Sequence, residues 1–256
     1  MEGAALARTL EACHPDAVVI GEPTDLRLCH GQRGRAKVAV QVRGRSSHAG
    51  HPEAGVNAVE RMAELIGAVA ALEHPVHPDL GRRSITCIDV HSEPYPSVST
   101  VPDRCIARFD CRFGPDDDDA SLSALLAAPA AEWEGASVHV ELAPAEFETY
   151  VGDQYAVPEL APAWFAAPDA PIVRAALDGL AGAGIPPRLA TYRFCTNGSL
   201  TAGTLGIPTV GFGVGREADA HSVDESIEVA QLERAVDGFA GLLAALLDAP
   251  GAVRGR

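Results

Sequence analysis

The feature that most constrains this sequence is the order of strand-like and helix-like segments between residues 36 and 142. Valine-rich alternation over 36–42 predicts a strand, and apolar residues at helical spacing predict a helix over 55–72. Two further β-like stretches, a helix and a strand follow at 84–90, 105–113, about 117–126 and 137–142. This β-α-β-β-α-β order predicts a ferredoxin-like domain, with its helices on one face of an antiparallel sheet.

Segments typical of an α/β domain flank it on both sides. Residues 16–20 form a short apolar run, typical of a strand buried on both faces, that stops at Gly21-Glu22-Pro23. In the last third we expect helices and strands in alternation, near 171–183, 187–190, after 196, at 209–212 and at about 229–247. The proline- and glutamate-rich stretch at 143–167 has little periodicity and is predicted to be a connector. We therefore predict an α/β domain in two segments, 1–34 and 146–256, around an inserted domain at 35–145.

Composition excludes several classes of function. With 47% hydrophobic and 21% charged residues, the 256-residue chain has the composition of a packed globular protein. A formal net charge of -15 opposes binding to phosphate backbones, so nucleic acid is not an expected partner. We find no apolar stretch long enough to span a membrane and no signal peptide after Met1, so we expect no membrane partner and a cytoplasmic protein.

Three polar side chains stand where a site could form. Glu22 follows a buried strand, and ligands of open α/β sheets collect beyond the carboxyl ends of strands. Position alone nevertheless favours a solvated turn glutamate. His221 lies in a glycine-rich loop, where it could be a metal ligand, although its position alone favours a simply exposed histidine. His48 occupies a turn of the inserted domain, and a solvated histidine is again the simpler interpretation.

Read together, five segments form a known pattern. They are VVIGEPTDL, GQRGRAKVAVQVRGRSSHAGHPEAGVNAVERM, VSTVPDRCIARFDCRF, FCTNGSLTAGTLGIPTVGFGVG and DAHSVDESIEV. In order and spacing they resemble the C-terminal part of the zinc amidohydrolase family that includes acetylornithine deacetylase, succinyl-diaminopimelate desuccinylase and aminoacylases. The stretches ITCIDVHSEPYPSVSTVPD and CTNG resemble most closely the subgroup of selenium-metabolism hydrolases.

The resemblance implies part of a zinc-peptidase-like α/β catalytic domain, whose inserted ferredoxin-like domain is a lid that forms a homodimer. Because such a domain has a free sheet edge and a helical face, we expect the dimer to bury the edge at the Val38 strand or the helix at 55–72. The implied cofactors are two zinc ions per complete site, with Co²⁺ or Mn²⁺ as alternatives. The implied substrates are N-acyl amino acids or small peptides.

The resemblance also assigns roles to individual residues. Glu22 and His221 would each bind one of the two zinc ions. His48 would reach the active site of the partner subunit and stabilise the oxyanion of the tetrahedral intermediate. Arg112 would contact the substrate carboxylate, and the pocket would be lined by Asn197 and Gly198.

Two departures from the family pattern bear on activity. In the family the remaining metal ligands and the general-base glutamate precede the GEP strand, whereas residues 1–21 here contain no H-x-D and no paired glutamates. Ser99 stands where related enzymes often place a substrate-binding asparagine. We therefore expect a metal-dependent amide hydrolase that is incomplete as given and inactive alone. The alternative is a non-catalytic dimerisation or regulatory module derived from this family.

Overall fold

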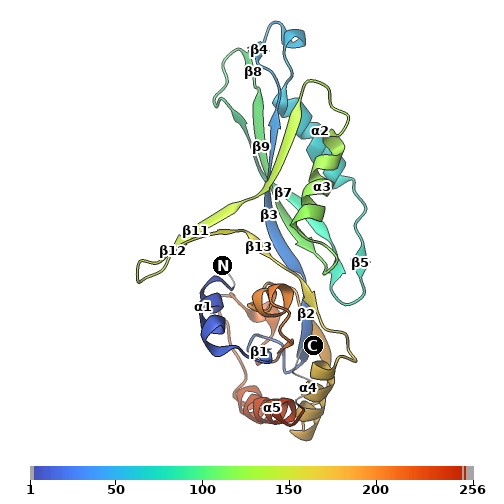
Figure 1. The fold of residues 1–256 in the computed structure, drawn as a ribbon, viewed down its shortest axis with the longest axis vertical. Coiled ribbons are helices and arrows are strands. Elements are labelled where there is room, and N and C mark those ends of the chain that lie inside the picture. The colour runs from blue at the N-terminus through green and yellow to red at the C-terminus, as the bar shows by residue number, and fades with distance from the viewer. Residues whose placement is uncertain (1–2, 250, 252–256) are drawn as a thin grey trace. The chain divides into compact units, whose positions relative to one another are not determined.

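A computed structural model describes residues 3–249 and 251, which fold into two compact units. Unit 1 comprises the described residues of Met1–Gly34, His77–Gly81 and Ala161–Arg256, and unit 2 comprises Arg35–Val76 and Arg82–Leu160. Both units combine helices with sheets, so the predicted α/β class is confirmed (Figure 1). Within the described ranges, no helix is both long enough and apolar enough to cross a membrane.

Unit 1 is built on a five-stranded mixed sheet. Its strands are β1 (Val18–Ile20), β2 (Leu28–Gln32), β14 (Trp164–Phe165), β15 (Leu189–Tyr192) and β16 (Thr209–Gly211). The strand order is β1-β16-β2-β14, with β15 also paired to β2, and β1 runs parallel to β16. Its helical segments are α1 (Ala4–Cys13), α4 (Pro171–Gly182), the π-helix η3 (Ser199–Thr204), the 3-10 helix η4 (Glu217–Asp219) and α5 (Val229–Asp248).

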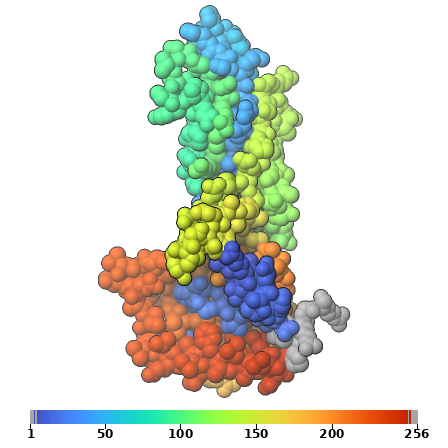
Figure 2. Space-filling model, turned by 60° about the vertical axis from the view of Figure 1, so that its left-hand side comes forward, coloured from blue at the N-terminus to red at the C-terminus, as the bar shows by residue number. Residues whose placement is uncertain are grey.

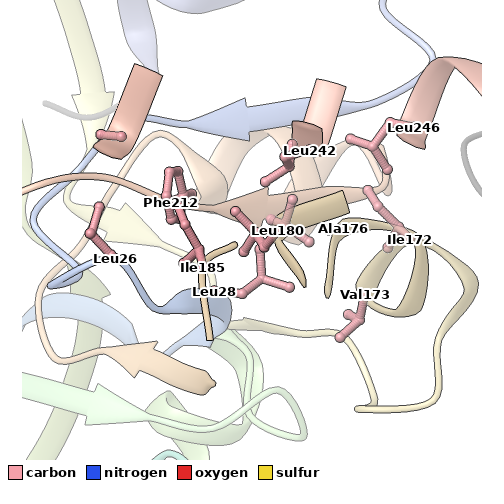
Figure 3. Close-up of a cluster of buried hydrophobic side chains, with 12 residues drawn as sticks. Leu26, Leu28, Ile172, Val173, Ala176, Leu180, Ile185, Phe212, Leu242 and Leu246 are labelled. Carbon is pink, nitrogen blue, oxygen red and sulfur yellow. The ribbon is translucent and has the colours of Figure 1, made fainter. Parts of the chain in front are cut away.

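The main core of unit 1 forms where α4 and α5 pack beside the sheet (Figure 3). Leu28 on β2 and Phe212 after β16 are fully buried together with Leu180 of α4 and Leu242 of α5. Burial of each such side chain stabilises the fold by roughly 1.5–3 kcal/mol. Pro171 opens α4, where its fixed φ suits the first helical position and its missing N–H leaves no donor unpaired.

The two core helices approach each other closely at a pair of glycines. A Cβ atom added at Gly179 of α4 would lie 2.5 Å from the carbonyl oxygen of Gly241 on α5. A Cβ atom at Gly241 would likewise lie 2.5 Å from the carbonyl oxygen of Gly179. The absence of a side chain at both positions therefore allows backbone contact between the helices.

Unit 2 contains the predicted β-α-β-β-α-β order, which is confirmed as β3 (Gly34–Arg43), α2 (Ala58–Ala70), β7 (Ser84–Glu93), β9 (Arg104–Phe113), α3 (Asp119–Ala127) and β10 (Ser137–Leu142). The strand order is β10-β3-β9-β7, with the short strand β13 (Leu160–Ala161) beside β3. Both helices lie along one face of this sheet (Figure 1). The remaining short elements are β4 (Ser47–His48), η1 (Pro52–Ala54), β5 (Val76–His77), β6 (Gly81–Arg82), β8 (Thr100–Val101), η2 (Ala128–Ala130), β11 (Pro144–Glu148) and β12 (Gln154–Pro158).

The sheet of unit 2 has one buried face and one polar face. On β3, Val38, Val40 and Val42 are fully buried, and their neighbours in sequence are at least partly exposed. The same alternation on β9 buries Phe109 and Cys111. Because side chains alternate across a strand, the residues between these buried ones lie on the face opposite α2 and α3. We call this the open face; it carries Arg35, Lys37 and Gln41 of β3 and Arg108, Asp110 and Arg112 of β9.

Two expectations about unit 2 are wrong. The strand around Val38 is not a sheet edge, because β3 lies between β10 and β9 and the edges of the main path are β10 and β7. The segment predicted to be a connector contains the antiparallel hairpin of β11 and β12, in which Phe147 stacks on Tyr155 with ring centroids 5.0 Å apart. Exposed and partly buried residues alternate along both strands, but a proline in each strand and two glutamates in β11 obscure the strand signal in the sequence.

The glycine contact between α4 and α5 predicts a difference between two alanine variants of the same helix. Gly179→Ala should destabilise the chain by about 1–3 kcal/mol, because the added methyl group overpacks the contact. Gly182→Ala is the matched control, since a Cβ atom there meets nothing within 4 Å, and it should be neutral or stabilising by up to about 1 kcal/mol. Urea denaturation followed by circular dichroism measures both changes, and equal stability of the two variants would contradict the account.

Candidate metal and substrate site

Glu22 and His221 follow the carboxyl ends of two neighbouring parallel strands. Ile20 at the end of β1 pairs with Gly211 at the end of β16, so both chains leave the sheet at the same edge. Glu22 follows β1 directly, and His221 lies in the loop that leads from β16 to α5. The two side chains are close enough for the charge of His221 to lower the pKa of Glu22. The structure therefore brings these two predicted metal ligands together.

Thr24 and Gly213 hold the Glu22 turn against the loop after β16. The Thr24 hydroxyl donates to the carbonyl oxygen of Gly213 at 3.0 Å and accepts from the Gly213 N–H at 3.0 Å. A Cβ atom at Gly213 would lie 2.4 Å from the carbonyl oxygen of Glu22, so only glycine fits there. Thr24 is itself buried. This pair of hydrogen bonds fixes the position of the Glu22 backbone relative to the loop that carries His221.

Burial makes the carboxylate of Glu22 costly to charge. Desolvation raises the pKa of Glu22 above its ordinary value, and the neighbouring His221 lowers it by a smaller amount. A cation bound beside a half-buried carboxylate favours the charged form of that group and so offsets the cost of its desolvation. His221 itself is exposed, with a left-handed φ of 62°, and its backbone N–H donates to the carboxylate of Glu225 at 3.0 Å.

A cavity of about 410 Å³ adjoins the Glu22 turn. Beside Glu22 and Pro23 it is lined by the loop after β16 and by one side of α5, including Leu232, Val236 and Phe239. The lining is mostly apolar, with the acidic residues Asp219 and Glu225 at the loop. The cavity can therefore hold an apolar group next to a carboxylate. Neither Asn197 nor Gly198 is among its lining residues.

The donor types of Glu22 and His221 fit zinc, which binds carboxylate oxygen and imidazole nitrogen. These two donors are too few, because a catalytic zinc normally takes three protein ligands. Among the residues that the structure describes, no group of three or more His, Cys, Asp or Glu side chains could hold a metal ion. The described residues thus supply part of a metal site.

Asn197 and Gly198 lie in a tightly bonded loop before η3. The Asn197 side-chain oxygen accepts from the backbone N–H of Gly3 at 2.8 Å, which ties this loop to the start of α1. A Cβ atom at Gly198 would lie 2.4 Å from Nε1 of the buried Trp164. Gly198 is therefore required by packing, whatever else it does.

Gln32 anchors the same loop and was not singled out from the sequence. Its fully buried amide oxygen accepts from the backbone N–H of Thr196 at 3.0 Å and from the Thr196 hydroxyl at 2.6 Å. Its amide nitrogen donates to the Ser199 hydroxyl at 2.6 Å. The sequence signal that could have identified Gln32 is its place at the end of a buried strand, because a buried polar group needs hydrogen-bond partners.

His48 and Arg112 belong to unit 2, as predicted from their place in the inserted domain. His48 lies on β4, which pairs with β8, and its side chain is exposed. Figure 2 shows the segment around residue 50, in light blue, at the surface at one end of unit 2. The Nδ1 atom of His48 accepts the backbone N–H of Gly50 at 3.0 Å, so the neutral ring carries its proton on Nε2. Arg112 lies on the open face, where its Nε donates to Asp110 at 2.7 Å.

Comparison with known sequences identifies the same domain. The sequence profile described as Peptidase dimerisation domain matches residues 30–133. The uncharacterized protein YgeY of Escherichia coli K12 is 31% identical over 215 residues, covering 82% of this chain and 53% of YgeY. An acetylornithine deacetylase of Aliivibrio fischeri is 26% identical over 244 residues, covering 90% of this chain and 57% of that enzyme. The chain thus spans about half the length of the curated relatives it matches.

Solved structures share the fold. Aminopeptidase PepT of Bacillus cereus superposes with a TM-score of 0.65 at 20% identity, covering 90% of this chain and 57% of PepT. The YXEP protein of Bacillus subtilis, described as a dinuclear metal binding peptidase from M20 family, superposes with a TM-score of 0.59 at 13% identity. That match covers 90% of this chain and 56% of YXEP.

The raised pKa of Glu22 predicts a pH-dependent effect of Glu22→Gln on stability without metal. A carboxyl group whose folded pKa exceeds its unfolded value contributes stability below the unfolded pKa and loses it as pH rises through the folded pKa. Glu22→Gln should therefore unfold at a higher temperature than the wild type at neutral pH, and the gap should close toward pH about 4. Thermal scans in EDTA measure this gap. Glu233→Gln, an exposed position on α5, controls for net charge, and a destabilised Glu22→Gln at neutral pH would contradict the account.

Proposed function

This chain belongs to the M20 family, and from that membership we propose that it forms part of a metal-dependent hydrolase of amide bonds in N-acyl amino acids or small peptides. In this proposal, residues 1–34 and 146–256 are segments of the catalytic domain and 35–145 is the lid. The protein would act in the cytoplasm. The observation that carries the proposal is the convergence of Glu22 and His221 at one edge of the unit 1 sheet, with the pKa of Glu22 raised by burial.

The proposed cofactor is a pair of zinc ions, with Co²⁺ or Mn²⁺ as substitutes. A structural neighbour described as a dinuclear metal binding peptidase supports a two-metal site. Glu22 would bind one ion and His221 the other, with further ligands from outside the described residues. When bound, such ions polarise the amide carbonyl and lower the pKa of a shared water. The apolar cavity beside Glu22 would receive a side chain of the substrate.

The other predicted site residues have proposed roles that suit their surroundings. His48 presents an N–H at Nε2, which is the donor that an oxyanion needs, and we propose that it acts in the partner subunit's active site. Arg112 would bind the substrate carboxylate from the open face of unit 2. Asn197 and Gly198 would line the substrate pocket of the complete enzyme at a place separate from the cavity beside Glu22, and their tight loop packing supports a positioning role.

A non-catalytic dimerisation module is less well supported. Such a module has no need of a half-buried carboxylate held against its own desolvation cost, since replacing it with a neutral residue would stabilise the fold. Residues kept in such costly positions are characteristic of functional sites. The family membership likewise favours an enzyme, because the named relatives include an acetylornithine deacetylase and an aminopeptidase.

The count of ligands predicts that this chain alone binds zinc weakly and does not hydrolyse amides. Weak binding is expected because each ion would keep one protein ligand, and it should be lost in Glu22→Ala and in His221→Ala. Asp224→Ala, an exposed position in the same loop, is the matched control. Competition with a zinc-binding dye measures affinity, and a panel of N-acyl amino acids and short peptides measures turnover. Tight binding of two zinc ions by the chain alone, with turnover blocked by Glu22→Ala, would contradict the expected incompleteness.

Turnover should appear when the missing ligands are supplied. The part of YgeY that this chain does not match is the donor polypeptide we propose, because the two sequences are 31% identical over the 215 residues that they share. The mixture should hydrolyse N-acyl amino acids in the presence of zinc and should lose that activity with Glu22→Ala. A mixture that forms a complex and binds zinc but hydrolyses no substrate would contradict the proposed hydrolase function and favour the non-catalytic dimerisation module.

Homodimer formation through unit 2 is a further part of the proposal. The edge strand β7 exposes Val90, which is 52% accessible. Val90→Lys should convert a dimer to a monomer of 26.6 kDa, because a buried lysine in the interface is costly. Val76→Lys, at a 59% exposed position off this strand, should leave the dimer intact. Light scattering at micromolar concentration distinguishes dimer from monomer for each variant. A wild-type chain that is only monomeric would contradict the proposed homodimer.

A further inference from the structure

Helix α5 carries apolar side chains on two of its faces. One is the core face described above, which includes Leu242 and Leu246. The other is a second stripe, in which every large side chain is between 46% and 81% accessible. Spacings of three and four residues keep these side chains on one side of the helix. We call this the outer stripe; it consists of Val229, Leu232, Val236, Ala240, Leu243 and Leu247.

The outer stripe distinguishes α5 from α4, the other core helix of unit 1. Every residue of α4 is described, and none of its large apolar side chains is exposed. On α5 the charged residues Glu233, Arg234 and Asp237 occupy the arc that remains between the two apolar faces. A helix that is apolar over most of its circumference is normally covered by other elements. Figure 2 shows α5, in red, at the surface of unit 1, and the described residues leave its outer stripe uncovered.

The outer stripe is continuous with the cavity beside Glu22. Leu232 and Val236 belong to the stripe and also line that cavity. Gln231, on the first turn of α5, accepts a backbone N–H of the loop after β16 at 2.6 Å and donates to the carboxylate of Asp25 at 2.8 Å. These bonds hold the start of α5 against the turn that carries Glu22. One surface therefore runs from the incomplete metal site along the helix.

Strand β1 provides an open sheet edge in the same unit. Within the described residues, β1 pairs with β16 alone. Val18 donates its N–H to the carbonyl oxygen of Pro208 at 2.9 Å, and the carbonyl oxygen of Ile20 accepts a backbone N–H from the end of β16. Because alternate residues of a parallel strand bond to opposite sides, Val19 directs its N–H and C=O away from β16. Such groups at a sheet edge are a template for another strand.

We propose that the outer stripe of α5 and the open edge of β1 together form a docking surface for the polypeptide that completes the metal site. This inference rests on the proposed function, and it adds the place at which the missing part binds and the form that it takes. A strand added parallel to β1 would end beside Glu22, where further ligands are needed. An apolar helix or loop of the same polypeptide would cover the outer stripe.

The occupant that fits this surface is the part of the relatives that this chain does not match. The match to YgeY covers 53% of that protein, so close to half of its length lies outside it. A second copy of this chain could also cover the outer stripe, but it would bring only another Glu22 and another His221. The metal site would then still lack the remaining ligands, so we assign the surface to the unmatched part.

Co-expression tests the docking surface without zinc and without turnover. The 256-residue chain is produced together with a tagged polypeptide that comprises the part of YgeY outside the match. The purified complex is then compared with the chain alone by hydrogen–deuterium exchange. The amide of Val19 should exchange about tenfold more slowly or less in the complex, because an added strand bonds the open edge of β1.

Charge substitutions test the outer stripe. Val236→Asp should lower the amount of complex recovered about tenfold or more, because docking would bury a charge. Leu247→Asp, three turns further along and 81% exposed, should do the same, and it is the second variant if Val236→Asp unfolds. Ala230→Asp places the same charge on the exposed polar side of α5, in line with Arg234, and is the matched control. It should form the complex like the wild type. Circular dichroism of each chain alone checks that it is folded.

Three results would overturn the proposal. The first is a folded wild-type chain that recovers none of the YgeY polypeptide. The second is recovery of the complex that is equal in the wild type, Val236→Asp and Leu247→Asp, or that falls equally in Ala230→Asp. The third is a dimer of the chain alone that Val236→Asp converts to a monomer in light scattering, because a second copy would then cover the stripe. A complex that forms as expected but hydrolyses no substrate would support the docking surface and contradict only the proposed hydrolase function.

Discussion

The parallel pairing of β1 with β16 is the contact on which the candidate site depends. Three residue pairs, from Val18 with Thr209 to Ile20 with Gly211, align the ends of two segments far apart in sequence. The hydrogen bonds between Thr24 and Gly213 continue this alignment beyond the sheet. Without that register, Glu22 would be a turn glutamate and His221 a loop histidine.

The energetics of Glu22 connect this fold to a function. Its neighbourhood includes an apolar cavity on one side and a histidine on the other, so the carboxylate is desolvated with incomplete compensation. A cation at this position would offset the desolvation cost and would bring Glu22 and His221 into one cluster.

Much of this organisation could be predicted from the sequence, because it rests on periodicity. Alternating valines identified β3, helical spacing identified α2, and strand-end position identified Glu22 and His221 as candidates. The central place of β3 could not be predicted, since strand order depends on contacts between segments distant in sequence. The bond from Gly3 to Asn197 was hidden for the same reason. The hairpin of β11 and β12 was missed because prolines and glutamates, which are depleted in strands, stand among its few strand formers.

The most direct test is a crystal structure of the chain grown with zinc, with anomalous diffraction recorded at the zinc edge. The account predicts an anomalous peak at the edge of the unit 1 sheet, at coordination distance from Glu22 or His221, about 2.0–2.2 Å from the carboxylate oxygen or imidazole nitrogen. Crystals of the Glu22→Ala, His221→Ala double variant should lack that peak. A peak that persists in the double variant, or zinc bound only at other residues, would contradict the assignment of these two side chains as metal ligands.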